Sequence, residues 1–133
     1  MNLVEKLIRI DKEKANEKET KKIKSRKLSR LLGEDTEITI QELSGKRFND
    51  LIAMCVDKNG KKDWHKINDM NLMFCVEGII EPSMKDASLM EHFGAKTPKD
   101  LVEILFDAES ASISDEISAL SGFTKDAEEE VKN

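Results

Sequence analysis

Aromatic residues, prolines and cysteines are scarce in this chain of 133 residues. It has no tyrosine, one tryptophan, two prolines and two cysteines. Aliphatic side chains and six methionines must therefore fill the interior, and methionine adapts well to irregular gaps. Cys55 and Cys75 both lie in apolar helical patterns, which favours buried free thiols in a reducing cytoplasm. Their spacing alone gives no support for a disulfide between adjacent helices.

Long apolar runs are also missing. None approaches the roughly 20 residues that a bilayer-spanning helix needs. The segment Leu3 to Ile10 is interrupted by Glu5, Lys6 and Arg9, which argues against a secretory signal. The length is that of one domain, and 38% apolar against 37% charged residues predicts a narrow core beneath a heavily solvated surface.

The residue types needed for catalysis or metal binding form no recognisable pattern. The two histidines, His65 and His92, are spaced from Cys55 and Cys75 in a way that matches no common zinc site. The glycines are scattered singly and build no phosphate-binding loop. The run Glu128–Glu130 lies in a polar terminal stretch where no rigid scaffold would hold a general acid. We therefore expect a protein that is not an enzyme and that uses no metal or other cofactor.

Charge is distributed unevenly along the chain. Residues 1–32 contain eleven Lys and Arg against five Asp and Glu, a net charge of about +6, so the remainder carries about −11 to give −5 overall. Such asymmetry indicates a partner surface. The basic segment 21–30 is the best signal for a small nucleic-acid-binding regulator. It lacks aromatic residues for base stacking, however, and its alternation also fits the wet face of an edge strand, so nucleic-acid binding is the less favoured interpretation.

The fold class predicted is mainly α with a small N-terminal β-hairpin, an α+β domain. A short helix over 1–10 is followed by a charged linker over 11–22 that has no core-sized apolar residue. Residues 23–123 are expected to form a single globular domain, with the hairpin over 23–43, and residues 124–133 an acidic flexible tail.

The hairpin is expected from two short strands, Ile23 to Leu28 and Glu37 to Leu43. In the second, Ile38 and Ile40 alternate with polar residues, and β-branched content is high. A two-stranded ribbon is marginally stable alone, so it must pack on the helices or pair with another chain.

Four to five helices are expected over residues 45–123. The first carries an apolar stripe at helical spacing, and a central helix should run from Trp64 to Ile80, ending before Pro82. Thr97 and Pro98 form a helix start, and Gly94 and Gly122 are helix-ending residues.

An ordered series of short motifs spans nearly the whole chain. It resembles the XkdN-like family of phage tail assembly chaperones. The series comprises Leu3-Val4-Glu5-Lys6-Leu7, Leu28-Ser29-Arg30-Leu31-Leu32-Gly33, Gln41-Glu42-Leu43-Ser44-Gly45, Glu81-Pro82, Lys85-Asp86, Leu89, Phe93-Gly94-Ala95, Leu105, Glu109, Ile117 and Leu120-Ser121-Gly122-Phe123. The chain departs from the family at Ala108 and Ser110, where a glycine and an aliphatic residue are common, so the break between the last two helices is less well defined.

The resemblance implies a chaperone from a long-tailed phage or prophage that acts without catalysis. Such proteins bind the tape measure protein, keep its apolar helices soluble and help recruit tail tube subunits. A longer form made by ribosomal frameshifting is common in such phages. The resemblance also implies a place in the host bacterial cytoplasm and absence from the mature virion. A structural tail component that stays in the virion is the other alternative, and a homo-oligomer is left open.

The apolar stripes of the last helices offer two interpretations. Part of the stripe forms a groove for a partner's apolar helix, or it is ordinary core, in which case truncating Leu101 or Leu105 to alanine would cost about 2–5 kcal/mol. Met84 and Met90, near the Pro82 loop, are expected to be the exposed and adaptable contacts. The full set of candidate partner-binding residues is Met84, Met90, Leu101, Leu105, Ile113, Ile117, Leu120 and Phe123.

Overall fold

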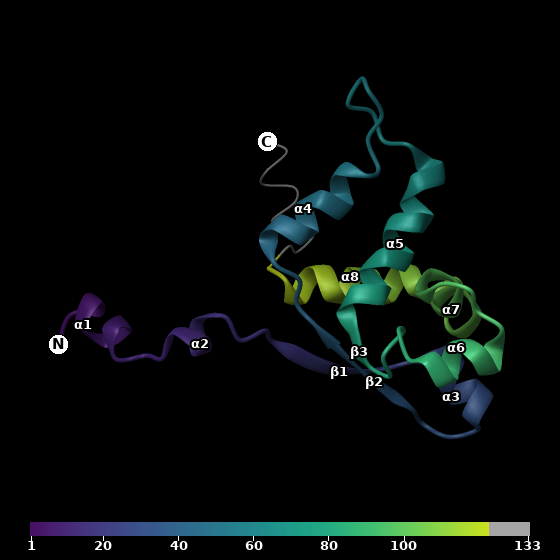
Figure 1. Ribbon diagram of the computed structural model, residues 1–133, viewed down its shortest axis with the longest axis horizontal. Coiled ribbons are helices and arrows are strands. Elements are labelled where there is room, and N and C mark those ends of the chain that lie inside the picture. Colours follow the sequence, from purple (N-terminus) through teal and green to yellow (C-terminus); the bar gives the residue numbers. More distant parts are fainter. Residues whose placement is uncertain (123–133) are drawn as a thin grey trace.

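The computed structural model describes residues 1–122, and within them the chain forms eight helices and a small three-stranded sheet (Figure 1). The helices are α1 (Leu3–Ile8), α2 (Lys12–Ala15), α3 (Arg26–Leu32), α4 (Gly45–Ala53), α5 (Trp64–Gly78), α6 (Ala87–Phe93), α7 (Pro98–Leu105) and α8 (Glu109–Leu120). The strands are β1 (Thr20–Lys24), β2 (Glu37–Gln41) and β3 (Ile79–Glu81). This confirms the mainly helical α+β class, and the five helices α4 to α8 fall within the four to five expected over residues 45–123. The expected tail at 124–133 and Phe123 lie outside the described residues.

The sheet has the order β1-β2-β3, and both pairings are antiparallel. Lys22 lies opposite Thr39 in the first pair, and Ile40 lies opposite Ile79 in the second. Ile38 and Ile40 are buried, as the alternating pattern of β2 predicted. The sheet is nevertheless more than an N-terminal hairpin, because its third strand comes from the middle of the chain.

The strand expected over Ile23 to Leu28 is wrong beyond Lys24. Ser25 ends the strand and begins α3, because its hydroxyl accepts a hydrogen bond from the Leu28 amide and so caps the helix. Gly33, with φ of 73°, ends the same helix in the left-handed conformation that glycine adopts without strain. The connection between the two strands is thus a capped helix.

The segment expected to be a linker, residues 11–22, contains two regular elements. Alternating Lys and Glu side chains suit helix formation, and residues Lys12–Ala15 form the single turn α2. Thr20 then begins β1, which pairs with β2 through Gln41. The lack of apolar residues predicted solvent exposure, and residues 11–22 are exposed throughout. It did not predict that the backbone from Thr20 onward would pair in a sheet.

α5 is the central helix, as expected, and it packs against α8, α7, α4 and β3. It ends at Gly78 rather than Ile80, because Ile79–Glu81 continues as an extended strand. The residue before a proline is driven out of the helical region, and here the strand extends three residues back from Pro82. α5 and α8 meet closely at Gly78, where the side chain of Ile117 occupies the space that a Cβ would need.

The break between α7 and α8 is set by Asp107. Thr97 and Asp100 begin α7 with a reciprocal capping box, and Pro98 occupies its first position. Asp107 has φ of 49°, a left-handed conformation that aspartate tolerates better than most residues. The turn between α7 and α8 is therefore made by an aspartate, one residue before Ala108.

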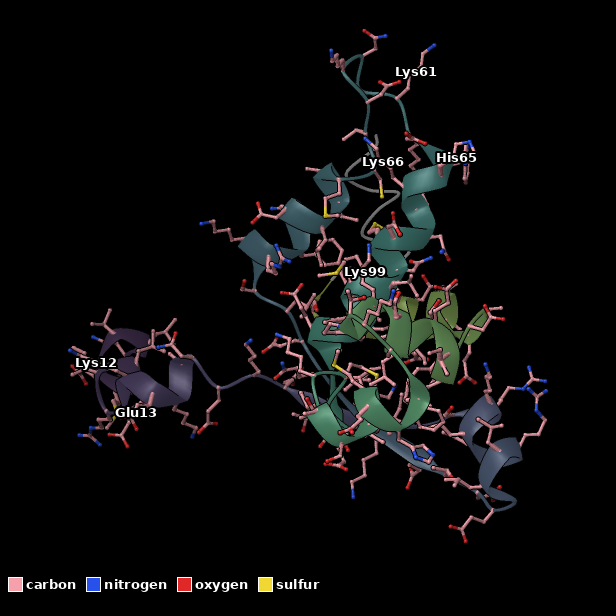
Figure 2. All side chains as sticks on the ribbon, turned by 45° about the vertical axis from the view of Figure 1, so that its right-hand side comes forward. Lys12, Glu13, Lys61, His65, Lys66 and Lys99 are labelled. Atoms are coloured by element: carbon pink, nitrogen blue, oxygen red, sulfur yellow. The ribbon has the colours of Figure 1, made fainter. Side chains whose placement is uncertain are left out.

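The two N-terminal helices project away from the body of the molecule (Figures 1 and 2). Neither α1 nor α2 contains a buried residue. The body begins where the backbone of Glu19 pairs with Glu42, next to the start of β1. We call residues 1–17 the N-terminal arm.

Candidate partner-binding surfaces

Most of the candidate residues on the last helices belong to the core. Leu101, Leu105, Ile113 and Ile117 are all buried in one cluster with β2 and α5. Their stripes face inward because α7 and α8 both pack against α5. As described, they form the core that the second interpretation predicted.

The expectation for Met84 is wrong, because its side chain is fully buried, with 0% exposed surface. The loop after Pro82 turns inward and places this flexible side chain within the main core cluster. Met90 and Leu120 are half-buried and pack against the edge of the cluster. Phe123 lies outside the described residues.

An apolar face that no other part of residues 1–122 covers belongs to α1. Its four apolar side chains, Leu3, Val4, Leu7 and Ile8, are between 56% and 77% exposed. The helix is nevertheless capped, since the Asn2 side chain accepts a hydrogen bond of 2.8 Å from the Glu5 amide. The sequence predicted the helix and its apolar side, but gave no signal that the body would leave that side uncovered.

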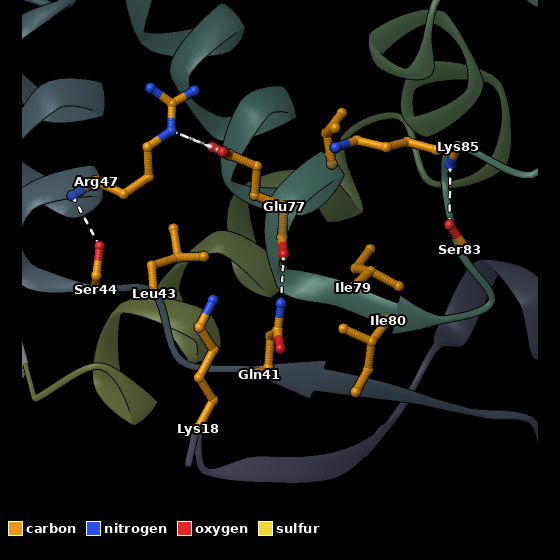
Figure 3. Close-up of a pocket in the computed structure, with 11 residues that line it drawn as sticks. Lys18, Gln41, Leu43, Ser44, Arg47, Glu77, Ile79, Ile80, Ser83 and Lys85 are labelled. Atoms are coloured by element: carbon orange, nitrogen blue, oxygen red, sulfur yellow. Dashed lines mark hydrogen bonds and ion pairs between the residues drawn. The ribbon is translucent and has the colours of Figure 1, made fainter. Parts of the chain in front are cut away.

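A groove on the body lies between the start of α4, the end of α5 and the loop after β3 (Figure 3). It measures about 360 Å³. Its lining is apolar at Leu43, Val76, Ile79 and Ile80, and Ile80 is 38% exposed. The positively charged side chains of Lys18, Arg47 and Lys85 also line it, and we call this hollow the basic groove.

Arg47 is fixed in the basic groove by an ion pair. Its Nε lies 2.7 and 2.8 Å from the two carboxylate oxygens of Glu77, and this hydrogen-bonded pair raises the pKa of the guanidinium. Gln41 holds the same segment by donating from Nε2 to the Glu77 carbonyl oxygen at 3.1 Å. Among residues 1–122, no carboxylate pairs with Lys18 or Lys85. The groove is therefore positively charged on an acidic protein.

A second hollow of about 490 Å³ adjoins the basic groove and shares Arg47, Val76, Glu77 and Lys85 with it. It extends the lining to Met73 and to the start of α7. Lys99 lies there as well, 3.5 Å from Asp69. The two hollows together form a surface suited to an extended segment with both acidic and apolar side chains.

Half of the basic side chains in the segment 21–30 make contacts within the molecule. Lys21 pairs with Glu116 at 3.1 Å, Lys24 pairs with Asp35 at 2.9 Å, and Lys27 donates to a backbone carbonyl of α7 at 2.8 Å. These three lysines are thus bound to other groups of the protein. The contacts weaken the nucleic-acid interpretation, which requires the same charges to be available for phosphates.

Glu109 joins the start of α8 to the start of α3. One carboxylate oxygen accepts from the buried Ser25 hydroxyl at 2.6 Å, and the other accepts from the Arg26 amide at 2.7 Å. The first residue of α8 thus satisfies free donors at the start of α3. Sequence reasoning noted Glu109 as part of a motif, but the partner 84 residues away had no sequence signal.

The two cysteines, Cys55 and Cys75, are free and buried, as expected. Both histidines are exposed. Within residues 1–122, no three His, Cys, Asp or Glu side chains come together as metal ligands would. No helix in the same range has the length and apolar content to cross a membrane.

The model of the family described as "Phage XkdN-like tail assembly chaperone protein" matches residues 4–133. Neither a curated protein nor a solved structure matches. The family match includes the N-terminal arm from residue 4 as well as the body.

Proposed function

Since the chain belongs to the family of XkdN-like phage tail assembly chaperones, we propose that it binds the tape measure protein of a long-tailed phage or prophage. In this proposal it keeps the apolar helices of the tape measure soluble until the tail tube assembles around them. The observation that carries the proposal is the family match over residues 4–133, nearly the full length of the chain.

The exposed face of α1 supports the proposal physically. A chaperone for apolar helices needs apolar surface that its own core does not use, and α1 offers four such side chains. An amphipathic helix recognises a partner through apolar residues at such spacing. Residues 9–17 of the N-terminal arm would let α1 reach a partner without disturbing the body.

We further propose that Met90 and Leu120, at the edge of the core, extend the contact where the partner lies against the body. The other expected partners are tail tube subunits and a frameshifted longer form of the chain. The proposed place of action is the cytoplasm of the host bacterium, and the chain acts without catalysis and leaves before the virion matures.

The test is co-expression with the tape measure protein encoded nearby, comparing soluble yield and co-purification with and without this chain. We expect the tape measure to become soluble only when the chain is present and to elute bound to it. A variant with Leu3→Ser and Leu7→Ser should lose most of this rescue, whereas Glu5→Gln on the same helix should keep it.

A tape measure that stays insoluble and unbound beside the intact chain contradicts the chaperone proposal for this chain alone. Rescue by the Leu3→Ser, Leu7→Ser variant at the full level contradicts only the role of α1. Detection of the chain in purified virions by mass spectrometry favours the alternative of a structural tail component.

A further inference from the structure

The cations of the basic groove are available to a partner's carboxylates. The side chains of Lys18 and Lys85 form no ion pair or hydrogen bond within residues 1–122. Arg47 uses only its Nε for Glu77, so its two terminal nitrogens remain free as donors within the same part of the chain. Glu77 is the one carboxylate among the lining residues, which gives the lining a net charge of +2.

The same surface combines these cations with apolar side chains. Ile80, at 38% exposed, lies in the groove, and the adjoining hollow adds Met73 and Pro98. The two hollows share four lining residues and are therefore continuous. Figure 3 shows Lys18 and Lys85 entering the groove from opposite sides, with Ile80 also in its lining. A continuous surface of this kind favours an extended peptide over a small anion, because a small anion would contact the charges alone.

We propose that the basic groove and the adjoining hollow bind an extended segment of a partner protein in which acidic and apolar side chains alternate. The carboxylates of that segment contact Lys18, Arg47 and Lys85, and its apolar side chains cover Ile80 and Met73. Charge complementarity selects an acidic segment, because a basic one would meet like charges at this surface.

The groove is a second binding site, separate from the apolar face of α1. Lys18 directly follows the N-terminal arm, so the groove lies at the base of the arm and α1 near its other end. Residues 9–17 between them span at most about 30 Å. A single partner that contacts both sites gains affinity from the linkage. This linkage rests on the proposed function, whereas binding of an acidic segment in the groove does not.

NMR titration of the isotope-labelled, full-length chain tests the groove without the tape measure protein. The probe is a capped peptide of about eight residues that alternates glutamate and valine, and its control alternates lysine and valine. The acidic peptide should shift the amide signals of Leu43, Ile80 and Lys85 but not that of Lys61, an exposed lysine at the far tip of the body (Figure 2). The basic peptide should shift none of them.

The matched variants address the charges. Lys18→Gln together with Lys85→Gln should weaken binding of the acidic peptide about five-fold, since each exposed ion pair contributes modestly. Lys61→Gln removes an equally exposed charge and should leave the affinity unchanged. The mapping on the unaltered chain stands even where a variant fails to fold.

An acidic peptide that shifts none of the groove signals, or that binds the double variant as tightly as the intact chain, overturns the proposal. Equal binding by a single-stranded oligothymidylate of the same charge also overturns it, because the groove would then be a general anion site. Shifts of the same signals when the chain is concentrated without peptide assign the groove to a second copy, with the same consequence. Peptide binding in the absence of tape measure rescue contradicts only the proposed function, so the two failures are distinguishable.

Discussion

Gly78 determines how closely α5 and α8 approach each other. A Cβ at this position would lie 2.8 Å from Cγ1 and 2.9 Å from Cγ2 of Ile117, closer than real Cβ contacts. We expect Gly78→Ala to lower the free energy of unfolding by about 1–3 kcal/mol, because the added methyl forces two packed helices apart. Urea denaturation followed by circular dichroism measures this change.

Gly45 provides the matched control for Gly78. It lies at the start of α4, and nothing within 4 Å would contact an added Cβ. Gly45→Ala should leave stability unchanged or raise it by up to about 1 kcal/mol.

In a chain that already carries Ile117→Ala, the cost of Gly78→Ala in free energy of unfolding should shrink. An undiminished cost there would show that the strain does not arise from Ile117.

Burial of Cys75 predicts a loss of stability at alkaline pH. Burial, with a smaller contribution from the charge of Glu109, raises the pKa of the Cys75 thiol to about 12. The unfolded chain releases this proton near pH 8.5, so the stabilising effect is complete below that pH and is lost as pH rises toward 12. The free energy of unfolding should fall by about 1.4 kcal/mol per pH unit above about pH 9.

Urea denaturation at pH 7.5, 9 and 10 measures this slope, with Cys75→Ala as the comparison. The variant should be less stable at neutral pH but should show a flatter decline, retaining only the contribution of Cys55, whose pKa burial also raises. Parallel declines in the two proteins would rule out Cys75 as the source.

Burial of the two cysteines was predictable from sequence, whereas burial of Met84 was not. Each cysteine sits among apolar residues at helical spacing, a local pattern that determines which side faces inward. Met84 follows a proline in a loop with charged neighbours, a context that usually indicates exposure. Only the path of the backbone after β3 turns its side chain into the core.

Among the elements, α3 and α8 depend on each other through Glu109. Glu109→Ala removes the acceptor for both the buried Ser25 hydroxyl and the Arg26 amide. Because a buried donor without a partner costs about 1–3 kcal/mol, we expect a loss of that size in the free energy of unfolding. Glu109→Gln should lose less, since its amide oxygen still accepts one of the two bonds.

The control for Glu109 is Glu103→Ala. Glu103 is an exposed acidic residue on α7 whose side chain makes no hydrogen bond or ion pair within residues 1–122. Its loss should change stability by less than about 0.5 kcal/mol. Hydrogen exchange would add detail, since Glu109→Ala should speed exchange at α3 before the rest of the body. Uniform acceleration would contradict a local role.

Helices were easier to predict from the sequence than strands. The caps at Thr97 and Gly94 and the apolar stripe of α4 are defined by residues that are close together in the sequence. β3 has only three residues and is defined by pairing with β2, some forty positions earlier. A strand so short carries no periodicity of its own, and its hydrogen-bond partner is determined by the tertiary fold.

For the molecule as a whole, the N-terminal arm should be separable from the fold. α1 has no buried residue and makes no hydrogen bond to the body within the described range. Removing residues 2–10 should therefore change the free energy of unfolding by less than about 0.5 kcal/mol. Leu101→Ala, in the core, should cost about 2–5 kcal/mol in the same urea assay. A comparable loss on removing the arm would show that α1 packs on the body in solution.

The basic groove is a property of the folded molecule as a whole, and the sequence gave no indication of it. Its positively charged residues, Lys18, Arg47 and Lys85, come from three regions of the chain that only folding brings together. Each has ordinary charged neighbours in sequence, so no local pattern marks any of them. The apolar side of α1, in contrast, was predicted from the sequence, because the spacing of four residues within one short helix defines it.

The contact between Ser25 and Glu109 has a consequence for how the chain is made. A ribosome synthesises β1 and α3 before α8, at about 5–20 residues per second. Until Glu109 and Ile117 have emerged, the nascent chain has neither the acceptor for Ser25 nor the side chain that packs on Gly78. The body therefore completes its fold only after α8 has been synthesised, and until then the apolar core segments that α8 covers remain exposed.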